Sequence, residues 1–176
     1  MRKICLFIAM SLDGYIADRQ GGVDWLNGQG NDHENIDAYS EFTKGIDTIL
    51  MGWNTYRQIV TELSPTQWVY GNFTTYVITH NELPSSEKIR FVNINPDDLV
   101  NRLKEETGKN IWICGGANLV QQLVAKNLID NYHVTVIPTL LGSGIRLFGN
   151  TAHEIQLKLL NTRSYNGMTD LIYTRR

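Results

Sequence analysis

The chain alternates short apolar runs of strand length with segments whose apolar residues recur at helical spacing. Residues 4–10 are continuously apolar, which is typical of a strand buried on both faces of an α/β sheet. Further strands are predicted at residues 47–51, 75–79, 89–94, 110–114 and 132–137, and helices follow Ile36, Gly52, Asn95 and Gly116. Asn95 is the expected cap of its helix, with a proline in the first position.

The end of the chain predicts a β-hairpin. Residues 156–165 and 168–174 alternate between apolar and polar positions, and Asn166-Gly167 between them is a strong signal for a two-residue turn. Taken in order, the elements predict one α/β domain over residues 1–176. We expect a mixed, mainly parallel sheet flanked by helices, with an antiparallel C-terminal hairpin.

Two predicted strands run into helices through glycine. Gly115-Gly116 leaves the first-turn N–H groups of its helix open to a ligand, which suits a phosphate. The junction at Gly52 places Asn54 and Thr55 in the first turn, where an amide and a hydroxyl can also meet a phosphate. Either junction can equally be a tight turn with ordinary capping, so the glycines alone leave both interpretations open.

The polar stretch between residues 11 and 35 contains five glycines and is long for a connection without structure. Loops of this kind are usually functional or mobile. Trp25 within it either pins the loop onto the core or forms a wall of a ligand cleft.

Composition narrows the classes of partner. Sixteen Lys and Arg against 18 Asp and Glu give a net charge of −2 without a long basic run, which argues against nucleic acid. The first apolar run is too short for a signal peptide or a membrane span, so a cytoplasmic protein with no membrane partner is expected. The histidines lack paired spacing, so no metal site is predicted, and Cys5 and Cys114 are expected to stay reduced.

Five ordered motifs resemble the dihydrofolate reductase superfamily. They are Ala9-Met10-Ser11-Leu12-Asp13-Gly14-Tyr15-Ile16-Ala17, Asp24-Trp25, Met51-Gly52-x-x-Thr55-Tyr56, Gly115-Gly116-Ala117 and Leu141-Gly142-Ser143-Gly144-x-x-Leu147-Phe148. The resemblance covers nearly the whole chain and is closest to the reductase domain of bifunctional riboflavin-biosynthesis enzymes and its small stand-alone relatives. It implies NADPH-dependent hydride transfer to a carbonyl or C=N bond of a pterin-like or pyrimidine-like small molecule, such as a 5-amino-6-ribosylaminouracil. A homodimer is a further expectation.

The resemblance also implies roles for individual residues. The backbones of Ala9 and Ile16 would hold the nicotinamide carboxamide, and Trp25 would border the nicotinamide. Phosphate contacts would come from Gly52, Asn54 and Thr55 at one helix start and from Gly115, Gly116, Ala117, Asn118 and Leu119 at the other. Thr79 and His80 would contact the adenosine 2′-phosphate, and Asp13 and Thr135 would lie on the substrate side.

Three positions depart from the pattern of the family. The residue after Gly52 is usually Arg and here is Trp53, which removes a cation and leaves the choice of NADPH over NADH open, although the indole can stack on the adenine. A Glu that is common two residues before the first glycine is here Ile113. The catalytic carboxylate expected after the Trp loop has Asp37 as its nearest candidate, with a solvated first-turn acid as the alternative. A non-catalytic nucleotide- or ligand-binding protein that retains the fold is therefore the alternative function.

Overall fold

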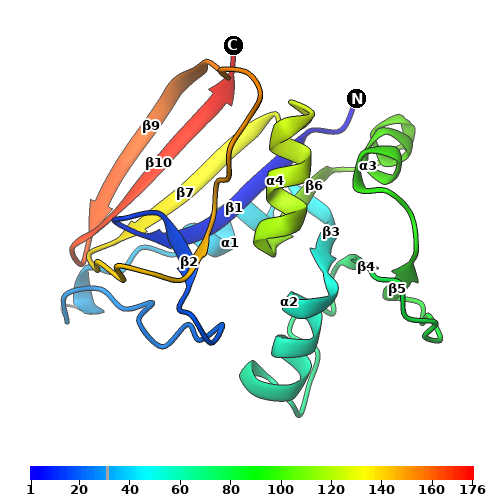
Figure 1. Ribbon diagram of the computed structural model, residues 1–176, viewed down its shortest axis with the longest axis horizontal. Helices are drawn as coiled ribbons and strands as arrows, with labels where there is room; N and C mark the ends of the chain where they lie inside the picture. The colour runs from blue at the N-terminus through cyan, green and yellow to red at the C-terminus, as the bar shows by residue number, and fades with distance from the viewer. Residues whose placement is uncertain (31) are drawn as a thin grey trace.

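The computed structural model describes residues 1–30 and 32–176. Its centre is an eight-stranded sheet in the order β5-β4-β3-β6-β1-β7-β10-β9, and a short β2-β8 ladder lies beside it (Figure 1). The strands are β1 (Ile4–Ser11), β2 (Tyr15–Ala17), β3 (Ile46–Gly52), β4 (Thr74–Ile78), β5 (Ile89–Val92), β6 (Asn110–Gly115), β7 (Asn131–Ile137), β8 (Ile145–Arg146), β9 (Leu157–Tyr165) and β10 (Met168–Arg175). The helical segments are η1 (Asp32–Glu34), α1 (Ala38–Thr43), α2 (Trp53–Gln58), η2 (Ile59–Leu63), α3 (Pro96–Glu105) and α4 (Ala117–Ala125). No helix in the described part of the chain is long and apolar enough to cross a membrane.

The first six strands in this order, β5-β4-β3-β6-β1-β7, run parallel to one another. Strand β10 pairs antiparallel with both β7 and β9. The hairpin turn lies at Asn166 and Gly167, whose φ angles of 47° and 72° fall in the left-handed region that Asn and Gly tolerate best. The predicted fold class is confirmed.

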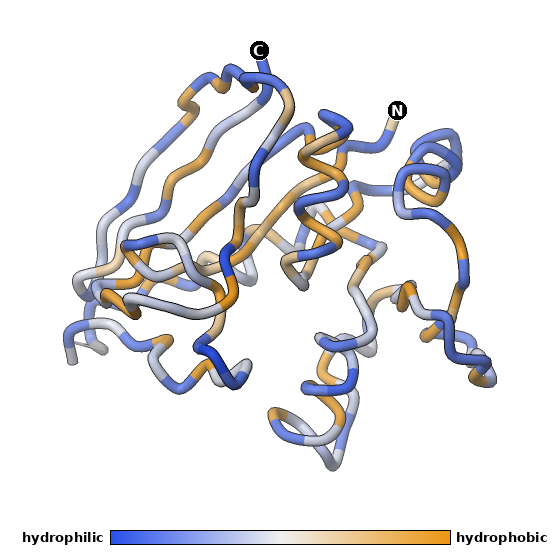
Figure 2. Tube along the Cα trace, in the orientation of Figure 1, coloured by the Kyte–Doolittle hydropathy of each residue, from blue (hydrophilic) through white to orange (hydrophobic). Residues whose placement is uncertain are grey.

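Alternation along the parallel strands directs side chains into two separate cores. On one face, Leu6 of β1 packs in a cluster with Leu123 of α4 and with residues of α3. The other face is rich in aromatic residues: Phe7 of β1 stacks on Phe42 of α1 at 4.4 Å between ring centroids, and Trp112 of β6 contacts both rings. Figure 2 shows apolar residues concentrated along the central strand β1. The sheet is therefore covered by helices on both faces, as its continuous apolar runs predict.

Two local predictions at helices are wrong in detail, and one element was not predicted. The helix after Gly52 is α-helical only to Gln58 and then continues as a π turn through Leu63. Asn95 stands at the N-cap of α3, but its side chain makes no capping hydrogen bond, and the helix start relies on Pro96 and the acids that follow it. The β2-β8 ladder escaped prediction because strands of two or three residues carry too little periodicity.

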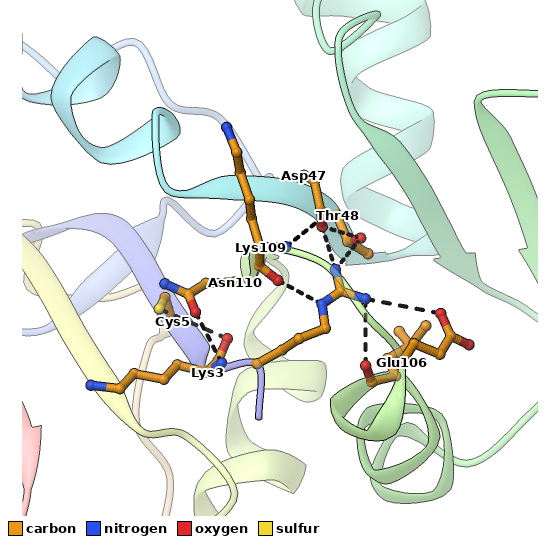
Figure 3. Close-up of polar contacts among 9 residues, drawn as sticks. Lys3, Cys5, Asp47, Thr48, Glu106, Lys109 and Asn110 are labelled. Carbon is orange, nitrogen blue, oxygen red and sulfur yellow. Dashed lines mark hydrogen bonds and ion pairs between the residues drawn. The ribbon is translucent and has the colours of Figure 1, made fainter.

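Arg2 clamps the amino ends of β1, β3 and β6 together. Its guanidinium forms an ion pair with Asp47 and donates hydrogen bonds of 2.6 Å to Thr48 Oγ1 and to the carbonyl of Lys109 (Figure 3). Gly108 allows this close approach, because a Cβ there would lie 2.6 Å from Asp47 Oδ2. The clamp therefore fixes the end of the sheet opposite to the carboxyl ends of the parallel strands.

Both cysteines are expected to titrate as free thiols. Cys5 lies opposite Trp112 in the β1-β6 register rather than opposite Cys114, and neither forms a disulfide. Burial raises the pKa of each thiol to about 11, so the reactive thiolate is scarce at neutral pH. We predict that a thiol reagent detects two thiols in the denatured protein and that both react slowly in the native protein. Fewer than two thiols after denaturation, or rapid reaction of the native protein, would contradict this.

Candidate functional site

The carboxyl ends of four parallel strands bring most of the predicted ligand residues to one edge of the sheet. The order β4-β3-β6-β1 sets side by side the end of β4 with His80, the end of β3 at Gly52, the end of β6 at Gly115 and the part of β1 that contains Ala9. Ligands of open α/β sheets bind outside these ends of the strands. Figure 1 shows α2 and the loop after β2 at this same edge. The predicted residues therefore form a continuous row.

Thr55 brings the two glycine junctions together. A Cβ at Gly116 would lie 3.2 Å from Thr55 Oγ1, and a Cβ at Gly115 would lie 3.4 Å from the same atom. Gly115 has a φ of 148°, which favours glycine, and its peptide bond to Gly116 is cis. At Gly52, by contrast, a Cβ would meet no protein atom within 4 Å. The backbone at Gly52 is thus accessible from the side that a side chain would occupy.

The first turn of α4 offers backbone donors rather than side chains. Gly116 is the N-cap and provides no side-chain hydrogen bond, so the N–H groups of Ala117 and Asn118 lack intrahelical partners. Leu119 is buried in the core, so that only its backbone is available to a ligand. The side chain of Asn118 is paired with Gln122 one turn later. Among the residues predicted for the other junction, Asn54 is exposed at the start of α2.

The end of β4 borders a pocket of about 500 Å³ lined by His80, Asn81, Glu82, Leu83, Pro84, Phe91 and Asn93. His80 Nδ1 lies 2.8 Å from Asn93 Oδ1, which is an acceptor, so Nδ1 donates and Nε2 remains for a ligand. Thr79 is buried, and its hydroxyl accepts a hydrogen bond of 3.0 Å from the N–H of Asn81. Trp53 is half-buried, with its ring 5.7 Å from that of Tyr56.

The loop after β1 is held by its own polar contacts. Asp13 accepts hydrogen bonds from Ser11 Oγ at 2.6 Å and from the N–H groups of Leu141 and Gly142 at 3.1 and 2.7 Å, and these bonds hold its pKa below the usual range. This contact explains why two of the sequence motifs occur together, since Asp13 of one fixes the backbone of the other. Ile16 in β2 packs against the core.

Trp25 makes its hydrogen bond within the loop, because its Nε1 donates to the carbonyl of Gly22 at 3.2 Å. The neighbouring Gly21 accepts from Gln58 Nε2 at 2.8 Å, which ties the loop to the end of α2. The half-buried indole is not among the residues that pack against either core in the described part of the chain. This placement favours a wall of the site over a pin to the core.

Asp37 lies at the N-cap of α1. Its exposed carboxylate accepts a hydrogen bond of 2.9 Å from the backbone N–H of Ser40, and that bond lowers the pKa of Asp37. The structure thus gives Asp37 the helix-start position that the sequence left as the alternative to a catalytic role. An ionised capping carboxylate has no proton to donate at neutral pH.

A buried polar cluster that the sequence did not indicate lies next to Thr135. Thr135 of β7 faces Ala9 of β1 on one side and Asp170 of β10 on the other. Its hydroxyl donates to Asp170 Oδ1 at 2.7 Å, and the Tyr165 hydroxyl donates to the same oxygen at 3.0 Å. His133 Nε2 lies 3.2 Å from the other carboxylate oxygen, Oδ2. Asp170 itself is 0% exposed.

Asp170 is ionised despite its burial. Desolvation alone would raise its pKa, but the nearby His133 imidazole and the hydrogen bond from Thr135 outweigh that effect, so the pKa is lowered. Arg163 of β9 adds a cation, with Nε 4.0 Å from Oδ2, and is itself paired with Glu41 of α1. The only feature of the sequence that pointed to this cluster was the hairpin turn, which places Asp170 opposite Arg163.

Comparison with known proteins identifies the family and the fold. A family model described as the RibD C-terminal domain matches residues 2–171. The chain is 39% identical to the uncharacterized protein YwjB of Bacillus subtilis (strain 168) over 177 residues, which span 99% of this chain and 98% of that protein. The crystal structure of a putative riboflavin biosynthesis protein from Shewanella sp. PV-4 is similar with a TM-score of 0.84 and 27% identity, covering 99% of each chain.

Dihydrofolate reductase from Enterococcus faecalis, complexed with NADP(H) and RAB-propyl, shares the fold. The TM-score is 0.68 at 18% identity, and the alignment covers 99% of this chain and 96% of that one. The superfamily and branch that the motifs resemble are thereby confirmed. The chain belongs to the RibD C-terminal domain family.

Proposed function

We propose that the protein is a reductase that uses NADPH to reduce a C=O or C=N bond of a pterin-like or pyrimidine-like small molecule. The observation that carries the proposal is the row of ligand residues at the ends of β4, β3, β6 and β1, whose order across four neighbouring strands suits an extended dinucleotide. Membership of the RibD C-terminal domain family supports a reductase, and the NADP(H) complex of the Enterococcus faecalis enzyme supports the cofactor.

Each strand end would hold one part of the dinucleotide. The adenosine and its 2′-phosphate would lie against His80 and Trp53, and the pyrophosphate would lie between Gly52 and the start of α4. Gly52 fits this role because no protein atom occupies the place of its missing Cβ. The backbone of Ala9 would then meet the nicotinamide, which supplies a hydride when bound. The chain contributes position, charge and exclusion of water.

The substrate would bind on the α1 side of the sheet, beside Ala9. Thr135 lies opposite Ala9 in the β1-β7 register, and its hydroxyl proton is committed to Asp170. The Thr135 oxygen is therefore left as an acceptor, which favours a substrate that presents an N–H group at this point. Aminopyrimidine and pterin rings offer such groups.

The decisive experiment is to mix purified protein with NADPH and either 5-amino-6-ribosylaminouracil phosphate or dihydrofolate. We expect NADPH to bind and its near-ultraviolet absorbance to disappear with at least one of them. Binding of NADPH without oxidation in either mixture would favour the non-catalytic ligand-binding protein. Failure to bind NADPH at all would remove the reductase proposal.

The preference for NADPH over NADH is expected to be modest. A charge-assisted hydrogen bond to the 2′-phosphate contributes roughly 1.5–3 kcal/mol, but Trp53 replaces the usual Arg, and the neutral His80 ring whose Nδ1 donates to Asn93 has no donor at Nε2. Dissociation constants for both nucleotides test this. Trp53→Arg should increase the preference.

Two other outcomes would change the assignment of the 2′-phosphate site. A strong preference for NADPH would assign the 2′-phosphate to Arg57, an exposed cation in the last turn of α2. Equal affinities for the two nucleotides would remove the 2′-phosphate site. His153→Gln changes an exposed histidine outside the row and should leave both constants unchanged.

A further inference from the structure

The proposed reaction needs a proton as well as a hydride, and the row at the sheet edge does not supply one. Asp37 is an exposed cap with a lowered pKa. Titratable groups that the proposal has not used meet in the cluster of buried His133 and Asp170 with half-buried Tyr165 and Arg163. This cluster adjoins Thr135 on the face of the sheet where the substrate would bind.

His133 has two chemically different nitrogens. Nε2 is buried 3.2 Å from Asp170 Oδ2, a close contact in which neither atom has hydrogen-bond geometry, and the ring packs edge-on against Phe7 at 4.6 Å and Phe42 at 6.2 Å between centroids. Nδ1 forms no hydrogen bond in the described part of the chain and, unlike Nε2, is not among the fully buried atoms that lack one. A carboxylate at Nε2 favours the tautomer with the proton on that nitrogen, so Nδ1 gains a proton only when the imidazole becomes a cation.

Polar and charged side chains of three elements lie near His133. Asp170 of β10 is adjacent, and His133 contributes to lowering the pKa of Glu41 of α1. Arg163 of β9 is paired with Glu41, and Tyr165 of β9 is neutral because burial and Asp170 raise its pKa. The strand β1 contributes only the ring of Phe7 at this point.

We propose that His133, held by the buried carboxylate of Asp170, donates the proton that accompanies hydride transfer. This inference rests on the proposed function. As the substrate carbon accepts the hydride, its C=N or C=O π bond breaks and the heteroatom keeps the electron pair. The Nδ1–H bond of His133 then breaks as an N–H or O–H bond forms on the substrate. Water restores the proton to Nδ1, Asp170 stays ionised, and no protein group is oxidised or reduced.

The pair of His133 and Asp170, called the dyad below, can be tested without turnover. NMR of the imidazole nitrogens should show one histidine that is present in the wild type and missing in His133→Gln. In Asp170→Asn the nitrogen signals of His133 should change, because the amide no longer favours the tautomer with the proton on Nε2. Unchanged signals in folded Asp170→Asn would overturn the dyad. His153→Gln is the matched control and should remove only an exposed, independent signal.

Turnover tests the role of the dyad. Using whichever of the two substrates above is reduced, His133→Gln should lower kcat about 100-fold while the dissociation constant of NADPH stays the same. In Asp170→Asn kcat should fall while the dissociation constant of NADPH and the KM of the substrate stay the same, a split that loss of packing alone would not produce. If Asp37→Asn rather than these variants lowered kcat, the donor would be Asp37 and the proposal would be overturned.

The experiments distinguish failure of the proposed function from failure of the proton-donor role. If wild-type protein reduces neither substrate, the proposed function falls and the proton-donor role falls with it, whatever the NMR signals show. If wild-type protein is active and His133→Gln retains its kcat in a folded state, only the proton-donor role is overturned. Thermal melts of both variants identify any loss that reflects unfolding.

Discussion

Gly52→Ala is expected to fold normally and to bind NADPH at least tenfold more weakly than the wild type. Gly52 has φ −80° and ψ 163°, which alanine adopts without strain, and the added Cβ would meet no protein atom within 4 Å. The only cost of the methyl group is therefore to a ligand that must approach the backbone there. Calorimetric or fluorescence titration with NADPH measures the effect, and a tenfold change corresponds to about 1.4 kcal/mol.

Gly116→Val should abolish binding altogether. Its Cβ would lie 3.2 Å from Thr55 Oγ1, and the branched methyl groups would cover the N–H groups at the start of α4. Because Thr55 must also shift, loss of binding in Gly116→Val is interpreted together with the result for Gly52→Ala. A thermal melt of Gly116→Val shows whether that variant is folded. Gly71→Ala is the control: its Cβ would lie 3.9 Å from the nearest atom, in the turn before β4, away from the row. Unchanged NADPH affinity in folded Gly52→Ala would refute the site.

Arg2→Met is expected to lower the free energy of unfolding by about 3 kcal/mol. The Arg2 side chain is 5% exposed, and its loss removes the guanidinium from Asp47, Thr48 Oγ1 and the Lys109 carbonyl at the junction of three strands, although Asp47 keeps hydrogen bonds from Thr48 and from the Lys109 N–H. Removing one partner of a buried ion pair typically costs about 3–5 kcal/mol, and the lower end applies because Asp47 is 39% exposed and can be hydrated. A protein of this size should melt roughly 10 °C lower.

Urea unfolding with an unchanged m-value would measure this loss. Arg102→Met is the matched control, because Arg102 is exposed on α3, and it should stay within about 0.5 kcal/mol of the wild type. Equal stabilities of the two variants would show that the clamp contributes nothing. Binding of NADPH by folded Arg2→Met should be unchanged, since the clamp lies at the opposite end of the strands.

Much of the fold could be predicted because its signals are local. The apolar run of β1, the glycine that separates β3 from α2 and the Asn166-Gly167 turn each depend on a few neighbouring residues and their backbone preferences. Two of the wrong predictions were local as well. Apolar periodicity does not encode the π turn after Gln58 or the absence of a capping hydrogen bond from the Asn95 side chain. The β2-β8 ladder depends on Asp13 and Gly144, which are far apart in the sequence.

The sequence by itself determined the glycine junctions and the candidate residues of the sheet edge, because glycine and helix-start chemistry act within one turn of the chain. Only the tertiary structure decided that these junctions lie in one row, since strand order is set by packing between distant segments. It also decided the environment of Asp170. Next to Arg163 in the hairpin it is an ordinary cross-strand acid, but pairing of β10 with β7 buries it against Thr135 and His133. Burial removes water from the carboxylate, so its remaining partners control its charge, and those partners are supplied by strands that the chain brings together only on folding.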